Sequence, residues 1–125
     1  GRIYILGGNR GDSAESDCRV SAVVNVYDTT TRQVTFGKSF ADARRSFAAG
    51  VIGGKLYVAG GYAAESTILS SVEEFSPQSG TWMSKAPITP RHLAGAAVAN
   101  DRMYVAGGSL SDPSDETNRV EVFFP

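Results

Sequence analysis

The chain contains very little of the material from which catalytic sites are usually built. Its 125 residues include one cysteine, Cys18, and one histidine, His92. A single cysteine excludes an internal disulfide and fits a reducing compartment such as the cytoplasm. A single histidine could serve a Ser-His-Asp triad only beside an orienting carboxylate, and no local motif supplies one. We therefore expect no catalytic residue, no bound metal and no cofactor in this stretch.

An excess of charge of one sign and long apolar runs are also missing. Twelve Lys and Arg residues stand against 13 Asp and Glu, which gives a net charge of -1. Without a basic stripe or a cationic amphipathic stretch, neither nucleic acid nor a membrane surface is an expected partner. The longest run of apolar and small residues, 93–99, is far too short to cross a bilayer. No stretch sustains an apolar period of 3.6 residues, so helices are not expected.

What the chain does contain is an internal repeat. The segment IYILGG at residues 3–8 returns as LYVAGG at 56–61 and as MYVAGG at 103–108. Each copy is an apolar, β-favouring run that stops on a glycine pair, and such a repeat predicts an array of similar units. The unequal spacing of the pairs, 53 and then 47 residues, places an insertion in the loop at 9–19. An aromatic residue follows each pair, with a constant spacing of 48 residues: Tyr27, Phe75 and Phe123.

The central unit divides into four short strand-like segments. Residues 46–52 and 55–61 flank a Gly53-Gly54 step, which predicts a tight hairpin, and Asn100-Asp101 takes that place in the third unit. Segments 71–77 and 81–85 supply the other two strands. Four short strands in a unit of about 50 residues are typical of a propeller blade. The first segment is rich in Ala and Gly, as expected for the crowded innermost strand.

The units do not amount to a closed ring. We expect residues 1–43 to form the second to fourth strands of one blade, 44–90 a complete blade, and 91–125 the first to third strands of another. The two ends duplicate strands, so identical copies would not combine into one blade. Open blade faces and strand edges invite aggregation. Because the chain also begins without methionine, we expect it to be a piece of a longer polypeptide whose remaining blades are partners of this one.

These residues resemble the kelch repeat, in which a strand ends in Gly-Gly, an aromatic follows in the third strand and a tryptophan in the fourth. The central unit carries Gly60-Gly61, Phe75 and Trp82, and Pro90-Arg91-His92 is similar to the family's step between blades. The first unit departs from the pattern with Val34 in place of tryptophan. The resemblance implies an incomplete all-β propeller of four-stranded antiparallel blades. It also implies structural roles for Gly7, Gly8, Gly60, Gly61, Gly107, Gly108, Tyr27, Phe75, Trp82 and Phe123.

In kelch proteins that bind peptides, the contacting positions follow the glycine pair and flank the start of the innermost strand. Carried over to this sequence, these positions are Asn9, Arg45, Ser46, Tyr62 and His92. The arginine that such domains often place at the strand start corresponds to Ser46 and Leu93, so that only Arg45, one position away, could substitute. The resemblance thus implies an interaction scaffold for a protein or peptide partner, serving for example as a substrate adaptor.

Two other classes of function stay open. Kelch-fold enzymes include galactose-oxidase-like copper oxidases, which need two histidines, two tyrosines and a cysteine–tyrosine crosslink, and sialic acid mutarotases, which need a sugar pocket lined by Arg and Glu. The segment could also be purely structural. The acidic loops after the first and third glycine pairs lack the EF-hand pattern, so we interpret them as solvated loop tips, with a calcium site as the open alternative. Their carboxylates are Asp12, Glu15, Asp17, Asp112, Asp115 and Glu116.

Overall fold

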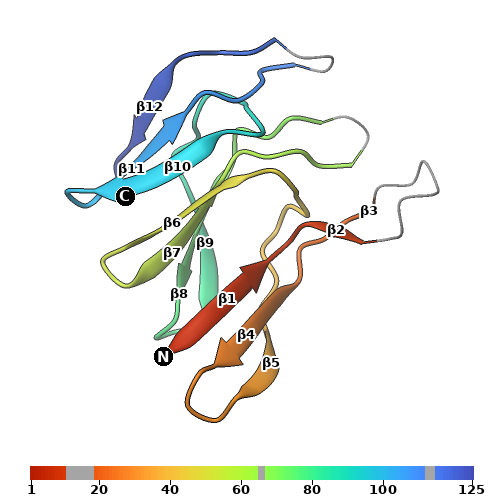
Figure 1. Cartoon of the computed structure of the whole chain (residues 1–125), viewed down its shortest axis with the longest axis vertical. Helices are drawn as coiled ribbons and strands as arrows, with labels where there is room; N and C mark the ends of the chain where they lie inside the picture. The colour runs from red at the N-terminus through yellow and green to blue at the C-terminus, as the bar shows by residue number, and fades with distance from the viewer. Residues whose placement is uncertain (11–18, 65–66, 112–114) are drawn as a thin grey trace.

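The computed structural model describes residues 1–10, 19–64, 67–111 and 115–125, and every regular element in these ranges is a β-strand (Figure 1). Three antiparallel sheets lie side by side and splay apart like a fan. Within the described ranges, no helix is long and apolar enough to cross a membrane. The predicted all-β architecture of an incomplete propeller is confirmed. Cys18 and the acidic residues 12, 15, 17 and 112 lie outside the described ranges.

The central sheet has four strands in sequence order, β6-β7-β8-β9, and its neighbours have three, β1-β4-β5 and β10-β11-β12. The short strands β2 and β3 form a separate ribbon. The predicted unit boundaries at 43/44 and 90/91 stay predictions. The strands are β1 Arg2–Leu6, β2 Asn9–Arg10, β3 Arg19–Val20, β4 Val24–Asp28, β5 Gln33–Gly37, β6 Ala48–Ile52, β7 Lys55–Ala59, β8 Val72–Ser76, β9 Thr81–Lys85, β10 Gly95–Ala99, β11 Arg102–Ala106 and β12 Val120–Phe123.

Two-residue turns set the register of the first hairpin in the second and third sheets. Gly53 and Gly54 have φ of +56° and +76°, and Ile52 pairs with Lys55 directly across them. Asn100 and Asp101 do the same between β10 and β11, with φ of +50° and +56°. Positive φ at both central residues defines the type I′ turn, whose twist matches that of the strands it joins.

The glycine pairs occupy equivalent places at the ends of β1, β7 and β11. All six glycines have positive φ: +53° and +95° in the first pair, +63° and +102° in the second, +66° and +92° in the third. Space is also limiting at Gly60, because a Cβ there would lie 2.6 Å from the carbonyl oxygen of Arg91. The chain that leads into the next sheet therefore passes directly over the glycine pair.

The main core fills the space between the central sheet and β10-β11-β12. Strand β6 contacts both β10 and β11, and a Cβ at Gly50 would lie 2.7 Å from Val98. This close approach explains why β6 and β10 are rich in Ala and Gly. Bulkier side chains on the outer strands fill the widening gap, where the rings of Tyr57 and Phe123 lie 5.6 Å apart. The buried members are Ala48, Ile52, Tyr57, Ala59, Val72, Ile88, Met103, Val105 and Phe123.

The outer strand of the central sheet is tied to the first sheet by Trp82. Its indole nitrogen donates to the Lys38 carbonyl at 2.7 Å, and its ring packs on Phe40 and Phe75 with centroids 5.5 and 5.1 Å away. In the first sheet the corresponding residue, Val34, pairs with Tyr27 and its side chain is exposed. The indole tie is therefore missing from the first sheet.

A buried carboxylate, Glu74 on β8, lies near the outer edge of the main core. It accepts hydrogen bonds from the Tyr57 hydroxyl at 2.8 Å and from the ammonium groups of Lys55 and Lys85 at 2.7 and 2.8 Å. These donors hold the pKa of Glu74 at about 2. Burial, together with the neighbouring Glu74 carboxylate, raises the pKa of Tyr57 to about 12. The charged carboxylate therefore has a complete set of donors.

Replacing Gly60 with valine should destabilise the fold by about 2 kcal/mol or more, because the new side chain meets the Arg91 carbonyl and forces a β-branched residue into left-handed backbone. Urea unfolding monitored by tryptophan fluorescence measures the change. Gly95→Ala is the matched control, since only one atom lies within 4 Å of that Cβ and it is 3.9 Å away. Equal stability of the two variants would contradict the assigned geometry.

Glu74 should also shape the acid limb of the stability curve. Its folded pKa, about 2, lies below the ordinary value of 4.5, so the stability it contributes is complete above pH 4.5 and is lost as the pH falls toward 2. Glu74→Gln should therefore be less stable near neutral pH and lose less stability over that interval. Urea midpoints measured at a series of pH values provide the test. Glu116→Gln, which removes the charge of an exposed carboxylate, is the comparison protein; parallel acid limbs in Glu74→Gln and the parent would refute the assignment.

Candidate functional site

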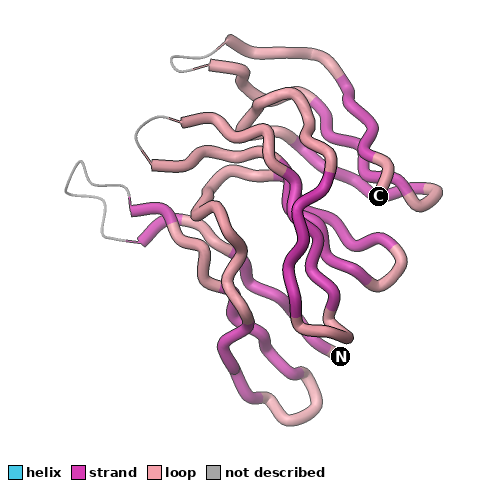
Figure 2. Tube along the Cα trace, turned by 180° about the vertical axis from the view of Figure 1, so that it is seen from behind, coloured by secondary structure: helices cyan, strands magenta, loops and turns pink. Residues whose placement is uncertain are grey.

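The loops of the three sheets gather at one end of the strands (Figure 2). At this end, the residue after each of the last two glycine pairs bridges to the segment that leads into an inner strand. Tyr62 pairs with Arg45, and Ser109 pairs with His92, through reciprocal backbone hydrogen bonds of 2.8–3.1 Å. The first pair is followed instead by Asn9, which starts the β2–β3 ribbon opposite Val20. The fold thus brings five loop segments to one face.

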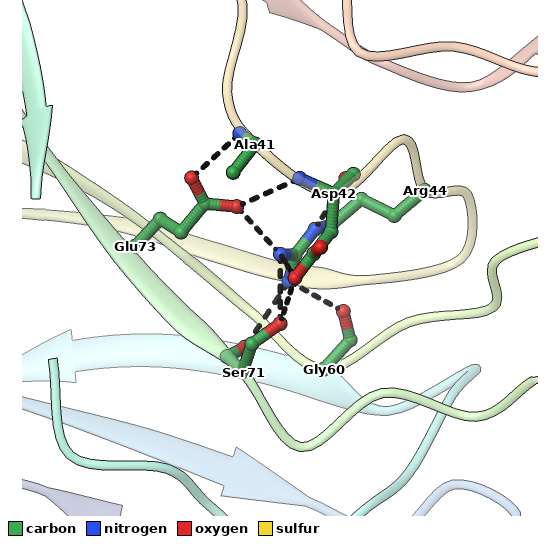
Figure 3. Close-up of polar contacts among 6 residues, drawn as sticks. All are labelled: Ala41, Asp42, Arg44, Gly60, Ser71 and Glu73. Atoms are coloured by element: carbon green, nitrogen blue, oxygen red, sulfur yellow. Dashed lines mark hydrogen bonds and ion pairs between the residues drawn. The ribbon is translucent and has the colours of Figure 1, made fainter. Parts of the chain in front are cut away.

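A fully buried arginine, Arg44, holds the segment that precedes β6 (Figure 3). Its guanidinium donates to the carbonyl oxygens of Gly60 and Ser71 at 2.9 and 3.1 Å, and to the Glu73 carboxylate at 2.7 Å. Glu73 in turn accepts from the backbone amides of Ala41 and Asp42 at 2.8 and 3.3 Å. Burial lowers the pKa of Arg44, and the carboxylates of Glu73 and Asp42 oppose that shift. The whole segment is thereby fixed to β8 of the central sheet.

The same anchor recurs one unit later at Arg91. Its side chain, only 2% exposed, donates to the carbonyl oxygens of Gly107 and Arg119 at 3.3 and 3.4 Å, and to Glu121 at 2.9 Å. The Thr89 amide donates to both oxygens of that carboxylate at 3.0 and 3.1 Å. Each anchor arginine thus binds the end of the second strand and the start of the third strand of the sheet it leads into.

The residues that follow the anchors form the exposed part of the face. Arg45 and His92 are half-buried, and after them Ser46 and Leu93 adopt left-handed backbone with φ of +52° and +58°. The Leu93 amide donates to the Ser46 carbonyl at 2.9 Å, which joins the two segments directly. Non-glycine residues rarely adopt this conformation, and where they do, the surrounding structure has to hold them there. Here the anchor arginine two residues earlier does so.

Three of the predicted site residues contact one another around the Tyr62 ring, with the His92 ring tilted against it by 48°. The Arg45 guanidinium carbon lies 4.7 Å from the centroid of the Tyr62 ring, and the His92 ring lies 5.1 Å from the same centroid. Tyr62 itself is buried, with 8% of its surface exposed. Cation–π contact with the ring fixes the guanidinium plane. We call Arg45, Tyr62 and His92 the stacked row.

Two nitrogen atoms of the stacked row have unused hydrogen-bonding capacity. Arg45 Nε and His92 Nε2 are buried atoms without a hydrogen-bond partner within the described part of the chain. Buried polar atoms are nearly always paired, because leaving one unpaired costs about 1–3 kcal/mol. A cleft of about 280 Å³ lies beside the row, lined by Leu93, Gly108, Ser109, Glu116 and Thr117. The face therefore combines two buried nitrogens, unpaired among the described residues, with a hollow beside them.

The remaining predicted site residues lie outside the row. Ser46 belongs to the same segment as Arg45, and its carbonyl rather than its side chain makes the contact described above. Asn9 is exposed on β2, and no hydrogen bond or ring contact links it to the stacked row within the described residues. Its structural connection to the row is therefore limited to the shared end of the fan.

No group of three or more His, Cys, Asp or Glu side chains that could hold a metal ion occurs among the residues that the structure describes. The ligand set that a copper oxidase needs is therefore not found in this part of the chain, and no observation here favours a sugar pocket lined by Arg and Glu.

The anchor arginines and their carboxylate partners are functional features that sequence reasoning missed. A signal for them does exist. Arg44 and Arg91 lie 47 residues apart, and Glu73 and Glu121 lie 48 residues apart, matching the spacing of the later glycine pairs and of the aromatics. A search for charged residues that share the repeat period would have found both pairs.

Comparison with known proteins gives a consistent result. The family model described as the Kelch motif matches residues 43–88 and 90–123. The F-box/kelch-repeat protein At1g30090 of Arabidopsis thaliana is 34% identical over 88% of this chain and 27% of its own length. The spermatocyte protein spe-26 of Caenorhabditis elegans is 30% identical over 96% and 21%, and the kelch repeat protein M-T9 of Myxoma virus 27% identical over 86% and 20%. The chain thus spans about a quarter of the length of such relatives.

Replacing Arg44 with methionine should cost about 3 kcal/mol or more of stability, because Glu73 is then left buried without its cationic partner. Thermal and urea unfolding measure the loss. The neighbouring substitution Arg45→Met is the control and should cost no more than about 1 kcal/mol, the value of a partly exposed cation–π contact. If the two variants unfolded alike, the anchor role of Arg44 would be wrong.

Proposed function

Because the chain belongs to the kelch-repeat family, we propose that it is a protein-interaction module that makes and breaks no covalent bond. Its partner is a protein or peptide segment bound at the loop face of the fan. The residues that act there are Asn9, Arg45, Ser46, Tyr62 and His92.

The observation that carries this proposal is the pair of unpartnered nitrogens in the stacked row. Arg45 Nε and His92 Nε2 are buried, yet they have no hydrogen-bond partner in the described chain. A ligand that supplies partners for both atoms removes a cost that the free protein bears, which favours binding. Backbone carbonyls and polar side chains of a peptide offer suitable groups. The anchors Arg44 and Arg91 keep these atoms in place before the partner arrives, which reduces the entropy cost of binding.

The members of the face have different roles in this proposal. Tyr62 is largely covered and acts as the platform that orients Arg45 and His92. Leu93 is 68% exposed beside the cleft and offers an apolar contact next to the polar pair. Ser46, next to Arg45, and Asn9, at the start of β2, enlarge the surface at the same end of the fan. A rigid scaffold that presents loop residues in this way is the usual arrangement for recognition.

An adaptor role is the finer form of the proposal. Two relatives carry F-box in their names together with kelch repeat, At1g30090 and At1g67480 of Arabidopsis thaliana. By analogy we assign this chain to the part of such a protein that recognises a substrate. This assignment rests on family analogy, whereas the binding face rests on geometry.

The outer faces of the two end sheets are proposed contacts for further blades. Phe36 is 86% exposed, and Ile3, Ile5 and Val34 share its face of the sheet β1-β4-β5. At the other end Val120 and Phe124 are exposed. Apolar surface of this kind marks an interaction site, and in a repeat protein the neighbouring unit covers it.

The double variant Arg45→Met, His92→Gln should weaken partner capture about tenfold or more, since a hydrogen bond to a charged group contributes about 1.5–3 kcal/mol. Its melting temperature should fall by only a few degrees, because the lost cation–π contact contributes about 1 kcal/mol. Quantitative affinity capture with mass spectrometry, followed by titration of the strongest partner, measures the effect. Thr30→Ala, in the turn between β4 and β5 at the opposite end of the strands, is the matched control and should bind like the parent. Unchanged capture by the double variant would refute the proposed face.

A further inference from the structure

The gap between the first and central sheets differs from the gap between the central and third sheets in one buried charge. On the face of the central sheet that packs against β10-β11-β12, the Glu74 carboxylate is surrounded by the Tyr57 hydroxyl and the ammonium groups of Lys55 and Lys85. This arrangement has one aromatic hydroxyl and two cations around one carboxylate. These three groups form an anion-binding site, and the Glu74 carboxylate of the protein itself is the bound anion.

The strand registers identify the equivalent positions in the first sheet. Tyr4 pairs with Val26 as Tyr57 pairs with Glu74. The first sheet therefore keeps the tyrosine, but a valine stands where the carboxylate would be. Arg2, two residues before Tyr4, corresponds to Lys55.

The second cation is displaced by one residue. Gly37 pairs with Val24 as Lys85 pairs with Val72, so a glycine occupies the position of the second lysine. The next residue, Lys38, supplies an ammonium group at that end of the strand. The first sheet thus carries the tyrosine and both cations of the anion site, without its anion.

An open cleft of about 380 Å³ lies between the first sheet and the central sheet at this place. Arg2, Tyr4, Val26, Thr35 and Lys38 line it from one side, and Phe75 from the other, with the Tyr4 and Phe75 rings 5.8 Å apart. Within the described residues, no hydrogen bond engages the Tyr4 hydroxyl and no ion pair engages Arg2 or Lys38. In the described part of the chain, the cleft thus has an aromatic wall, a tyrosine hydroxyl without a hydrogen bond, and two cations outside any ion pair, of which Arg2 still attracts the Asp28 carboxylate.

One carboxylate lines the cleft, and the adjoining turn already uses it. Asp28 Oδ1 accepts from the backbone amides of Thr30 and Thr31 at 2.8 and 3.0 Å. The amides of Thr31 and Thr30 lower the pKa of Asp28, so it stays charged. Two cations against one carboxylate leave the cleft with a net positive charge.

We propose that this cleft binds a carboxylate group of an incoming ligand, which takes the place that Glu74 occupies in the next gap. The Tyr4 hydroxyl donates to it, Arg2 and Lys38 neutralise it, and the aliphatic part of the ligand packs on Phe75 and Val26. The group belongs either to a small dicarboxylate or to a glutamate side chain of a peptide. The site is separate from the loop face and does not depend on the proposed function.

Nuclear magnetic resonance titration of the protein provides the test, with glutarate and an acetylated, amidated Ala-Ala-Glu-Ala-Ala peptide as probes. Either probe should produce saturable shifts in the amides of Thr35 and Gly37, whereas glutaramide and the Gln version of the peptide should not. Binding of glutarate alone assigns the site to a small molecule, and binding of the peptide alone assigns it to a protein side chain; binding of both shows that the group itself suffices. No saturation by either probe up to about 50 mM would overturn the proposal.

Variants separate the site from general charge attraction. Tyr4→Phe and Arg2→Met should each raise the dissociation constant about three- to tenfold. Arg102→Met is the matched control, because Arg102 occupies the position of Arg2 in the third sheet and covers the Phe124 ring instead, at 4.9 Å; it should leave the affinity unchanged. Val26→Glu should abolish probe binding without unfolding the protein, because it restores the internal carboxylate. Equal effects of Arg2→Met and Arg102→Met, or full affinity in Val26→Glu, would also overturn it.

Discussion

The structure depends on an arginine that belongs to two sheets at once. The carbonyl oxygen of Arg44 accepts from the Gly8 amide at 3.0 Å in the sheet it leaves, while its guanidinium binds Gly60 and Glu73 in the sheet it approaches. Arg91 repeats this between the next two sheets, accepting from Gly61 at 2.8 Å. A buried ion pair of this kind contributes little net stability, since desolvation offsets most of the attraction. Its effect is geometric, because it fixes how one sheet follows another.

The glycine pairs and the stacked row both follow from that constraint. A Cβ at Gly7 would lie 2.7 Å from the Arg44 carbonyl, so the pair must be glycine where the anchor segment crosses it. On the far side of the crossing, the chain has to turn sharply into the inner strand, and Ser46 and Leu93 take left-handed backbone to do so. Arg45 and His92 then face outward because Arg44 and Arg91 face inward. The residues that hold the sheets together, Arg44 and Arg91, are therefore directly followed in the chain by the residues proposed to bind a partner.

The sequence predicts the strands, the tight turns and the incomplete propeller, because each has a local signal: alternation of apolar residues, a Gly-Gly or Asn-Asp step, a fixed period. The anchor network is beyond such reasoning. Nothing local distinguishes Arg44 from Arg45, although one is buried and the other faces the loop end. Glu73 and Glu74 are adjacent on one strand and look like a solvated pair, yet they point to opposite faces and serve different gaps. The carboxylate partners of the two buried arginines lie 29 and 30 residues away, and hydrophobic periodicity does not reveal such pairs.

The ion pair between Arg44 and Glu73 also determines where one repeat unit can be separated from the next without loss of contacts. The carboxylate partner of Arg44 lies in the sheet that follows, and so does the tryptophan that binds Lys38. A unit that begins at the first residue of β6 would contain Glu73 and Trp82 but would lack Arg44 and Lys38, the residues that they bind. A unit that begins just after Gly37 would contain both partners of each contact. Duplication or exchange of units therefore preserves the contacts between sheets only when the boundary falls after β5, the outer strand of the preceding sheet.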